Sequence, residues 1–156
     1  MNLVVGDDAA MVALGDRLAR ICPGAMVIYL FGSLGAGKTT LVKGFMHGLG
    51  YNGAVKSPTY TLIEPYDIHG RVIYHLDLYR VSDASELEYL GLRELQEGDA
   101  VVLVEWPEHG QGFLPAADIL LNIKYAPEGR HIELHGCSSL GDRFIKDLEI
   151  AAFSEG

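Results

Sequence analysis

The stretch AMVIYLFGSLGAGKT, residues 25–39, decides the fold. Residues 25–31 form a continuous apolar run, rich in β-branched and aromatic side chains, of the length expected for a buried strand. Residues 32–39 then match the pattern G-x-x-x-x-G-K-[ST] at every fixed position. A strand that leads through such a loop into a helix is the setting that a phosphate-binding P-loop requires. The stretch therefore predicts an α/β protein with a nucleotide-phosphate site.

The residue types of the loop suit a phosphate ligand. Gly32, Gly35 and Gly37 allow successive backbone N–H groups to converge on phosphate oxygens without clashes from Cβ atoms. The N-terminus of the following helix adds partial positive charge at the same point. We expect the Lys38 ammonium to reach the terminal phosphates and the Thr39 hydroxyl to ligate Mg²⁺. Pattern and context together favour this interpretation over a flexible glycine loop with a surface lysine.

A P-loop site also needs a carboxylate that holds Mg²⁺ or orients the attacking water, and two residues qualify. Asp77 ends the predicted strand 71–77, and Glu105 ends the predicted strand 100–105. The second strand is the more fully apolar, so we expect it in the core of the sheet. The first contains His75 and is expected nearer a sheet edge. One of the two carboxylates is predicted at the metal.

Three further features can each be explained by a structural role or by a functional one. The hydroxyl-rich run 57–61 lies where P-loop switches place a threonine that senses the γ-phosphate, but its spacing alone favours an ordinary turn. His75 and Asp77 share a strand face, yet no further His or Cys has ligand-like spacing, so a metal cluster is not expected. Trp106 directly follows Glu105 and is predicted to cover the site, fill the core or face a partner.

The rest of the sequence alternates helices and strands. Four helices are expected, over about 8–20, 38–49, 83–98 and 140–151. Two hairpins are expected, with strands at 55–64 and 71–77 and at 119–125 and 131–135. Interleaved elements predict a three-layer α/β P-loop fold, with a mostly parallel central sheet and antiparallel strands added at its edge. The length of 156 residues predicts a single domain over 1–156.

Composition excludes several kinds of partner. With 21 acidic and 12 basic residues the net charge is −9, which suits neither direct binding of nucleic acid phosphates nor an anionic membrane.

No apolar run approaches the about 18 residues of a membrane span, and residues 1–10 lack the basic region of a signal peptide. Cys22 and Cys137 form no C-x-x-C pair and are expected as buried thiols. These features predict a cytoplasmic protein.

The sequence also bears on the nucleotide and the reaction. The nearest match to a guanine-binding N-K-x-D signature, at 122–125, lacks both the spacing and the Asp, which favours ATP. The main alternative is a small-metabolite kinase, because many such kinases are this short. Such enzymes need clustered arginines to clamp two sets of phosphates. Here the arginines are scattered, at Arg71, Arg80, Arg93 and Arg130.

Several segments together resemble the TsaE family, also called YjeE. They are LGAGKTT at 34–40, VKSPTYTL at 55–62, HLDLYR at 75–80, ELEYLG at 86–91 and LVEWP at 103–107. Many families share the P-loop, but KSPTYT and VEWP are more specific, and the similarity spans about 7–135. The resemblance implies a bacterial Mg²⁺-dependent ATPase, weakly active alone, that is required for the threonylcarbamoyl group on adenosine 37 of tRNAs. It also implies that the protein acts with TsaD and TsaB, that hydrolysis resets the complex, and that tRNA is contacted only indirectly.

The resemblance implies roles for individual residues. Those that would bind the ATP phosphates are Gly35, Ala36, Gly37, Lys38, Thr39 and Thr40. Thr39 and Glu105 would hold Mg²⁺. Asp77 would lie beside the γ-phosphate, as a partner of the metal's water or as the base that orients the attacking water. Lys38, Asp77 and Glu105 would thus be the catalytic residues.

The resemblance extends to the surroundings of the site. Residues 57–61 would form a switch-like loop, Arg130 would contact the nucleotide, and Trp106 would stack near the site. The helix around Met11 would meet the base through an apolar or backbone contact. Ser33 stands where many members have Asp. Ser33 occupies a variable position of the loop, so we expect phosphate binding to be unaffected. A metal or partner contact made by the Asp of other members would be missing here.

Overall fold

Strands and helices alternate along the chain, and the computed structural model describes residues 1–155, without the side chains of 96, 97 and 153–155. The strands are Asn2–Val5 (β1), Met26–Phe31 (β2), Ile63–Ile68 (β3), Arg71–Asp77 (β4), Val101–Glu105 (β5), Ile119–Ala126 (β6) and Gly129–Gly136 (β7). The α-helices are Asp8–Ile21 (α1), Lys38–Gly48 (α2) and Ser139–Glu155 (α3). Short 3-10 helices lie at Ala84–Leu90 (η1), Leu92–Glu97 (η2) and Pro107–Gly110 (η3).

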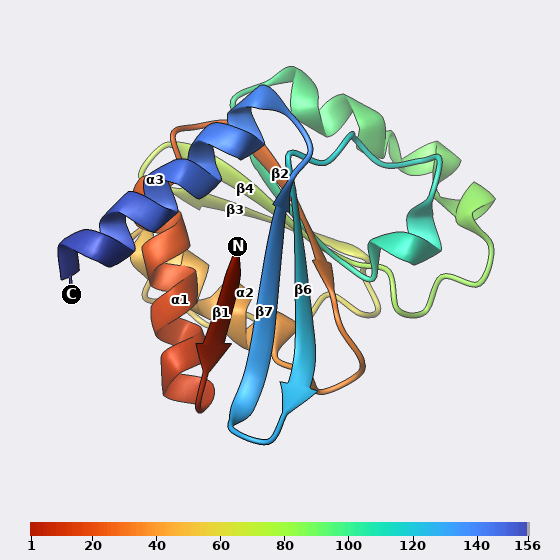
Figure 1. The fold of residues 1–156 in the computed structure, drawn as a ribbon. Helices are drawn as coiled ribbons and strands as arrows, with labels where there is room; N and C mark the ends of the chain where they lie inside the picture. Colours follow the sequence, from red (N-terminus) through yellow and green to blue (C-terminus); the bar gives the residue numbers. More distant parts are fainter. Residues whose placement is uncertain (156) are drawn as a thin grey trace.

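The strands form one sheet in the order β1-β7-β6-β2-β5-β4-β3 (Figure 1). The three central pairs are parallel: β6–β2, β2–β5 and β5–β4. The outer pairs β1–β7, β6–β7 and β3–β4 are antiparallel. Parallel strands covered on both faces have continuous apolar sequences, as β2 and β5 do. The order confirms the predicted parallel core with antiparallel edge strands, and β4 lies next to the edge strand as expected.

Two apolar cores cover the two faces of the sheet. The larger core packs α1, α2 and α3 on one face and includes Phe45 and Leu103. The smaller core lies on the other face, where Leu87 of η1 covers Val102 of β5. Leu103 and Val102 point to opposite faces because side chains alternate along a strand. Figure 1 shows the α-helices gathered on one side and η1 and η2 on the other, which confirms the three-layer arrangement.

Helices α1 and α2 approach each other through their backbones. A Cβ atom at Gly15 would lie 2.2 Å from the carbonyl oxygen of Leu41, and one at Gly44 would lie 2.1 Å from that of Val12. Real Cβ atoms do not come so close to backbone, so both positions require glycine. This contact holds α2 beside α1 on one face of the sheet, and Lys38 is the first residue of α2.

We predict that Gly44→Ala destabilises the fold, because the new methyl group meets the α1 backbone. Overpacking of this kind costs about 1–3 kcal/mol, which outweighs the helix propensity that alanine adds. Chemical denaturation should show the loss in the free energy of unfolding. The control is Gly98→Ala, since a Cβ atom at Gly98 has nothing within 4 Å. Equal stability of the two variants would contradict the tight helix contact.

The prediction of one helix over 83–98 is wrong. The segment forms the two 3-10 helices η1 and η2, separated by Gly91 with φ of 60°. Glycine adopts this left-handed conformation readily, so it ends the first helix and starts the second. Asp83 caps the first of these helices, because its carboxylate accepts a hydrogen bond from the backbone N–H of Ser85.

Other boundaries also differ from expectation. Strand β1 was not predicted, because only its pairing with β7 makes it a strand. The first hairpin strand begins at Ile63, and most of the expected stretch 55–62 forms turns and irregular chain. Cys22 is buried as expected, whereas Cys137 is exposed because it lies in the link between β7 and α3. Among the described residues, no helix is long and apolar enough to cross a membrane.

Candidate nucleotide-binding site

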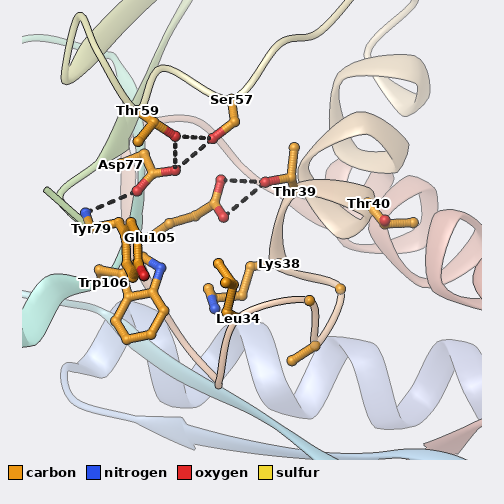
Figure 2. Close-up of a pocket in the computed structure, with 13 residues that line it drawn as sticks. Leu34, Lys38, Thr39, Thr40, Ser57, Thr59, Asp77, Tyr79, Glu105 and Trp106 are labelled. Carbon is orange, nitrogen blue, oxygen red and sulfur yellow. Dashed lines mark hydrogen bonds between the residues drawn. The ribbon is translucent and has the colours of Figure 1, made fainter.

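The candidate site lies at the carboxyl ends of three neighbouring strands. The P-loop begins where β2 ends, while Asp77 and Glu105 end β4 and β5. Asp77 and Glu105 are register partners in the parallel pair, so their side chains leave the sheet side by side. Figure 2 shows the pocket that the loop and the two carboxylates line together. Ligands of open α/β sheets bind at this edge.

The P-loop has the backbone that its sequence predicts. Gly35 and Gly37 have φ of 79° and 118°, values that a side chain would strain. Lys38 folds back over the loop, where its Nζ donates hydrogen bonds to the carbonyl oxygens of Gly32 and Ser33 at 2.5 and 3.0 Å. Ala36, Thr39 and Thr40 also line the pocket. The structure thus brings the predicted phosphate-binding residues to one place.

The charge of Lys38 depends on its neighbours. The side chain is buried, and this burial lowers the pKa of its ammonium. The carboxylates of Glu105, Asp77 and Glu108 act in the opposite direction, but their effect is smaller. A phosphate beside the ammonium would favour its charged form in the same way as these carboxylates do.

Glu105 joins the P-loop helix to the sheet. Both of its carboxylate oxygens accept from the Thr39 hydroxyl, at 2.9 and 3.0 Å (Figure 2). Its Oε2 also lies 2.6 Å from Nε2 of His75. Glu105 is 2% exposed, and a buried carboxylate requires such partners. The sequence did not predict the contact with His75. The signal that could have found it is its position on the same strand face as Asp77, two residues earlier.

Asp77 is held by the loop that precedes β3. Its Oδ2 accepts from the hydroxyls of Ser57 and Thr59, at 2.5 and 3.2 Å, and these hydroxyls lie 3.0 Å from each other. Its Oδ1 accepts from the backbone N–H of Tyr79 at 3.0 Å. The spacing of 57–61 favoured an ordinary turn, whereas the structure places two of its hydroxyls on a carboxylate of the site. Only the tertiary fold reveals this contact.

Aromatic side chains cover the mouth of the pocket. The Trp106 ring centroid lies 4.3 Å from Nζ of Lys38, and Tyr79 and His109 flank it at 5.0 and 5.4 Å. Trp106 has φ of 57°, an uncommon value for a residue with a side chain. Nδ1 of His109 lies 2.9 Å from the carbonyl oxygen of Leu78, which connects the segment after β5 to the segment after β4. Of the three positions expected for Trp106, the structure shows two, because the ring lies at the site and also packs against the smaller apolar core.

The hairpin of β6 and β7 braces the P-loop from outside. Nε of Arg130 donates to the carbonyl oxygen of Ala36 at 2.9 Å, and its guanidinium stacks on Tyr125 at 4.1 Å. The Tyr125 hydroxyl donates to the carbonyl oxygen of Leu34 at 3.3 Å. Arg130 therefore touches the loop backbone, and its contact with the nucleotide stays a prediction. Met11 is buried next to Gly37, where a Cβ atom would lie 3.0 Å from the Met11 methyl carbon.

The remaining arginines point to other surroundings. Arg71 donates to the carbonyl oxygens of Cys22 and Gly24, and Arg80 stacks on Tyr60. Arg93 donates to the carbonyl oxygen of Gly112. Among the described residues that line the pocket, Lys38 is the one lysine or arginine. The scattered arginines of the sequence are thus scattered in space as well.

The oxygen atoms beside the P-loop suit Mg²⁺. This ion prefers oxygen ligands and is usually bound by one or two protein groups, with waters and substrate phosphates completing the octahedron. The Thr39 hydroxyl and the Glu105 carboxylate already touch at the end of β5. The described part of the chain has no group of three or more His, Cys, Asp or Glu that could hold a metal ion. A metal at this site would therefore need phosphate oxygens as well.

The sheet order, the glycine loop at the end of β2 and the helix that follows define the class of protein as a three-layer α/β protein of P-loop fold. The family model described as Threonylcarbamoyl adenosine biosynthesis protein TsaE matches residues 5–132. The chain belongs to the TsaE family, as its motifs predicted.

Individual relatives agree with this assignment. The tRNA threonylcarbamoyladenosine biosynthesis protein TsaE of Haemophilus influenzae is 48% identical over 146 residues, which cover 90% of this chain and 92% of that protein. The protein of the same name from Streptomyces coelicolor is 38% identical over 151 residues, covering 91% and 99%. The crystal structure of YdiB from Bacillus subtilis superposes with a TM-score of 0.82 and 30% identity, over 97% of this chain and 94% of that one.

We predict that Arg130→Ala weakens the binding of ADP because the P-loop loses its outer brace. Loss of one charge-assisted hydrogen bond corresponds to about 1.4 kcal/mol, or roughly a tenfold rise in Kd. Titration calorimetry with ADP measures the change. Arg143→Ala, an exposed position on α3, removes the same charge and serves as control. An unchanged Kd in Arg130→Ala would show that the brace does not affect the loop's affinity.

Proposed function

We propose that this chain is the Mg²⁺-dependent ATPase of tRNA threonylcarbamoyladenosine formation, and that it acts in the cytoplasm with TsaD and TsaB. The observation that carries the proposal is the contact of Thr39 with Glu105 at the P-loop, next to Asp77. The names of the relatives supply the pathway, because they are tRNA threonylcarbamoyladenosine biosynthesis proteins. The P-loop supplies the substrate class, a nucleoside triphosphate.

Lys38 and the backbone of the loop would bind the phosphates. Successive N–H groups of the loop and the N-terminus of α2 favour negative charge at one point. Lys38 would exchange the carbonyl oxygens of Gly32 and Ser33 for oxygens of the β- and γ-phosphates. Nζ of Lys38 is the donor before and after this exchange. Only the lysine side chain would have to move. Gly35, Ala36, Gly37 and Thr40 would complete the phosphate site.

Thr39 and Glu105 would hold Mg²⁺ together with the nucleotide. The ion would neutralise the charge that develops on the β- and γ-oxygens. Thr39 and Glu105 come from α2 and β5, and both elements are anchored in the larger core, so their separation is set by the fold. Such preorganised charge stabilisation is the main contribution that P-loop proteins make to phosphoryl transfer.

Asp77 would orient the attacking water. It lies beside Glu105 at the end of β4, but both of its oxygens already accept hydrogen bonds from Ser57, Thr59 and the Tyr79 backbone. Each carboxylate oxygen has two lone pairs and Oδ1 accepts only from the Tyr79 backbone, so Asp77 can still accept a hydrogen bond from water. Because Oδ2 is held by the hydroxyls of Ser57 and Thr59, a partner that moves residues 57–61 would change how Asp77 holds that water, which supports a rate that depends on partners.

The surroundings of the site support protein partners. Tyr60 is 82% exposed and Leu34 is 68% exposed, and both lie at the rim of the pocket or on the adjacent switch-like loop. Large exposed apolar side chains beside a site often mark a protein contact. The net charge of −9 favours partners that hold the tRNA in its place. A kinase reaction is less well supported, because the described pocket lining offers no arginine for a second phosphate group.

We predict that Glu105→Gln and Lys38→Ala lower ATP hydrolysis by roughly 10²–10³-fold, because each removes one charge-stabilising group of the transition state. Release of phosphate from ATP, measured with and without TsaD and TsaB, tests this. The wild type should be weakly active alone and more active with both partners. Glu149→Gln, an exposed position on α3, is the charge-matched control and should behave as the wild type.

Two outcomes would contradict the proposal. Normal turnover by Glu105→Gln would remove Glu105 from the metal site. Transfer of labelled γ-phosphate to a small molecule, with no free phosphate, would identify a kinase.

A further inference from the structure

His75 is a buried titratable residue that the proposed function leaves without a role. It lies in β4, is 0% exposed and shares the α1-α2 face of the sheet with Ile73 and Asp77. Its Nε2 lies 2.6 Å from Oε2 of Glu105, whose carboxylate is buried as well. Histidine is a residue of intermediate burial in proteins, so a ring with no exposed surface is uncommon. Full burial against a carboxylate of the site calls for a physical explanation.

The contacts determine where the ring carries its hydrogen. A carboxylate can only accept, so the hydrogen of this bond belongs to Nε2 of His75. Nδ1 is buried and has no hydrogen-bond partner among the described residues. His75 therefore presents a fixed donor to Glu105.

This donor acts on one oxygen of the carboxylate. Oε2 of Glu105 contacts both His75 and the Thr39 hydroxyl, whereas Oε1 contacts the hydroxyl alone. The bond to His75 therefore sets the rotation of the carboxylate about its own axis. His75 holds Oε2 from strand β4. Oε1 therefore faces the P-loop, where the Thr39 hydroxyl contacts it.

We infer that His75 is the positioning residue of the Mg²⁺ site, which orients Glu105 through its Nε2–H and thereby sets the affinity for the metal–nucleotide complex. The inference rests on the proposed function, since it needs Glu105 to be a metal ligand. Hydrogen-bond partners of metal ligands commonly have this role, and their removal costs about 10–100-fold in metal affinity. His75 itself would touch neither the metal nor the nucleotide.

A purely structural role makes different predictions. If His75 only satisfies a buried carboxylate, its loss lowers the stability of the protein and leaves the dependence of binding on Mg²⁺ unchanged. If it positions Glu105, the loss appears in the metal dependence even when the protein is folded. Glutamine separates the two cases well, because its side-chain amide can present an N–H near the position of Nε2.

The experiment compares His75→Leu, which removes the donor, with His75→Gln, which keeps one. Ile73→Val, on the same strand face and fully buried, is the control for a packing defect that does not touch Glu105. Titration calorimetry with adenylyl imidodiphosphate gives the Kd with Mg²⁺ and with EDTA. A second titration, of Mg²⁺ into protein with the nucleotide present, gives the apparent metal affinity. Thermal unfolding without ligand shows whether each variant is folded.

We expect His75→Leu to lose about 10–100-fold in apparent Mg²⁺ affinity while its Kd in EDTA stays that of the wild type. His75→Gln should recover most of the loss, and Ile73→Val should show none. Wild-type metal affinity in a folded His75→Leu, or a loss of metal affinity in His75→Gln as large as in His75→Leu, would overturn the inference. If His75→Leu does not fold, the result with His75→Gln decides. A wild type whose nucleotide binding ignores Mg²⁺ would instead count against the proposed function itself.

Discussion

The carboxylate of Glu105 is buried at the end of the central strand β5, and a buried charge is stable only when its oxygens are hydrogen-bonded. Its partners come from the two sides of the site: the Thr39 hydroxyl from the first turn of α2, and His75 from the neighbouring strand β4. One carboxylate thus joins the P-loop helix to two strands. Lys38 precedes Thr39 in α2 and Asp77 lies two residues after His75 in β4, so both charged groups lie close to this connection.

The site combines a rigid part and a part built from surface loops. The glycine contact between α1 and α2 and the brace from Arg130 hold the P-loop from two sides. Asp77, by contrast, is reached by hydroxyls of the run 57–61, and Trp106 covers Lys38 from the segment after β5. In the proposed function, the first part would bind the nucleotide and the second part would be the one that a partner rearranges.

Local sequence was sufficient for much of the fold. The apolar run 25–31, the glycine pattern 32–39 and the strand before Glu105 each specify their own conformation, so β2, the P-loop and β5 could be predicted. The segment 83–98 could not, because Gly91 adopts a left-handed conformation that divides it into two 3-10 helices. Strand β1 was also out of reach, since a four-residue strand at the chain end exists only through its pairing with β7.

The sequence by itself singled out the candidate site residues: the P-loop with Lys38 and Thr39, and the two strand-end carboxylates Asp77 and Glu105. These residues could be named because their motif and strand context lie within short stretches of chain. Only the tertiary structure decided which of them touch. The pairing of Glu105 with His75, of Asp77 with Ser57, and of Arg130 with the Ala36 carbonyl joins residues 20 to 94 positions apart. No local pattern encodes such contacts, because they depend on the strand order and on how α2 packs against the sheet.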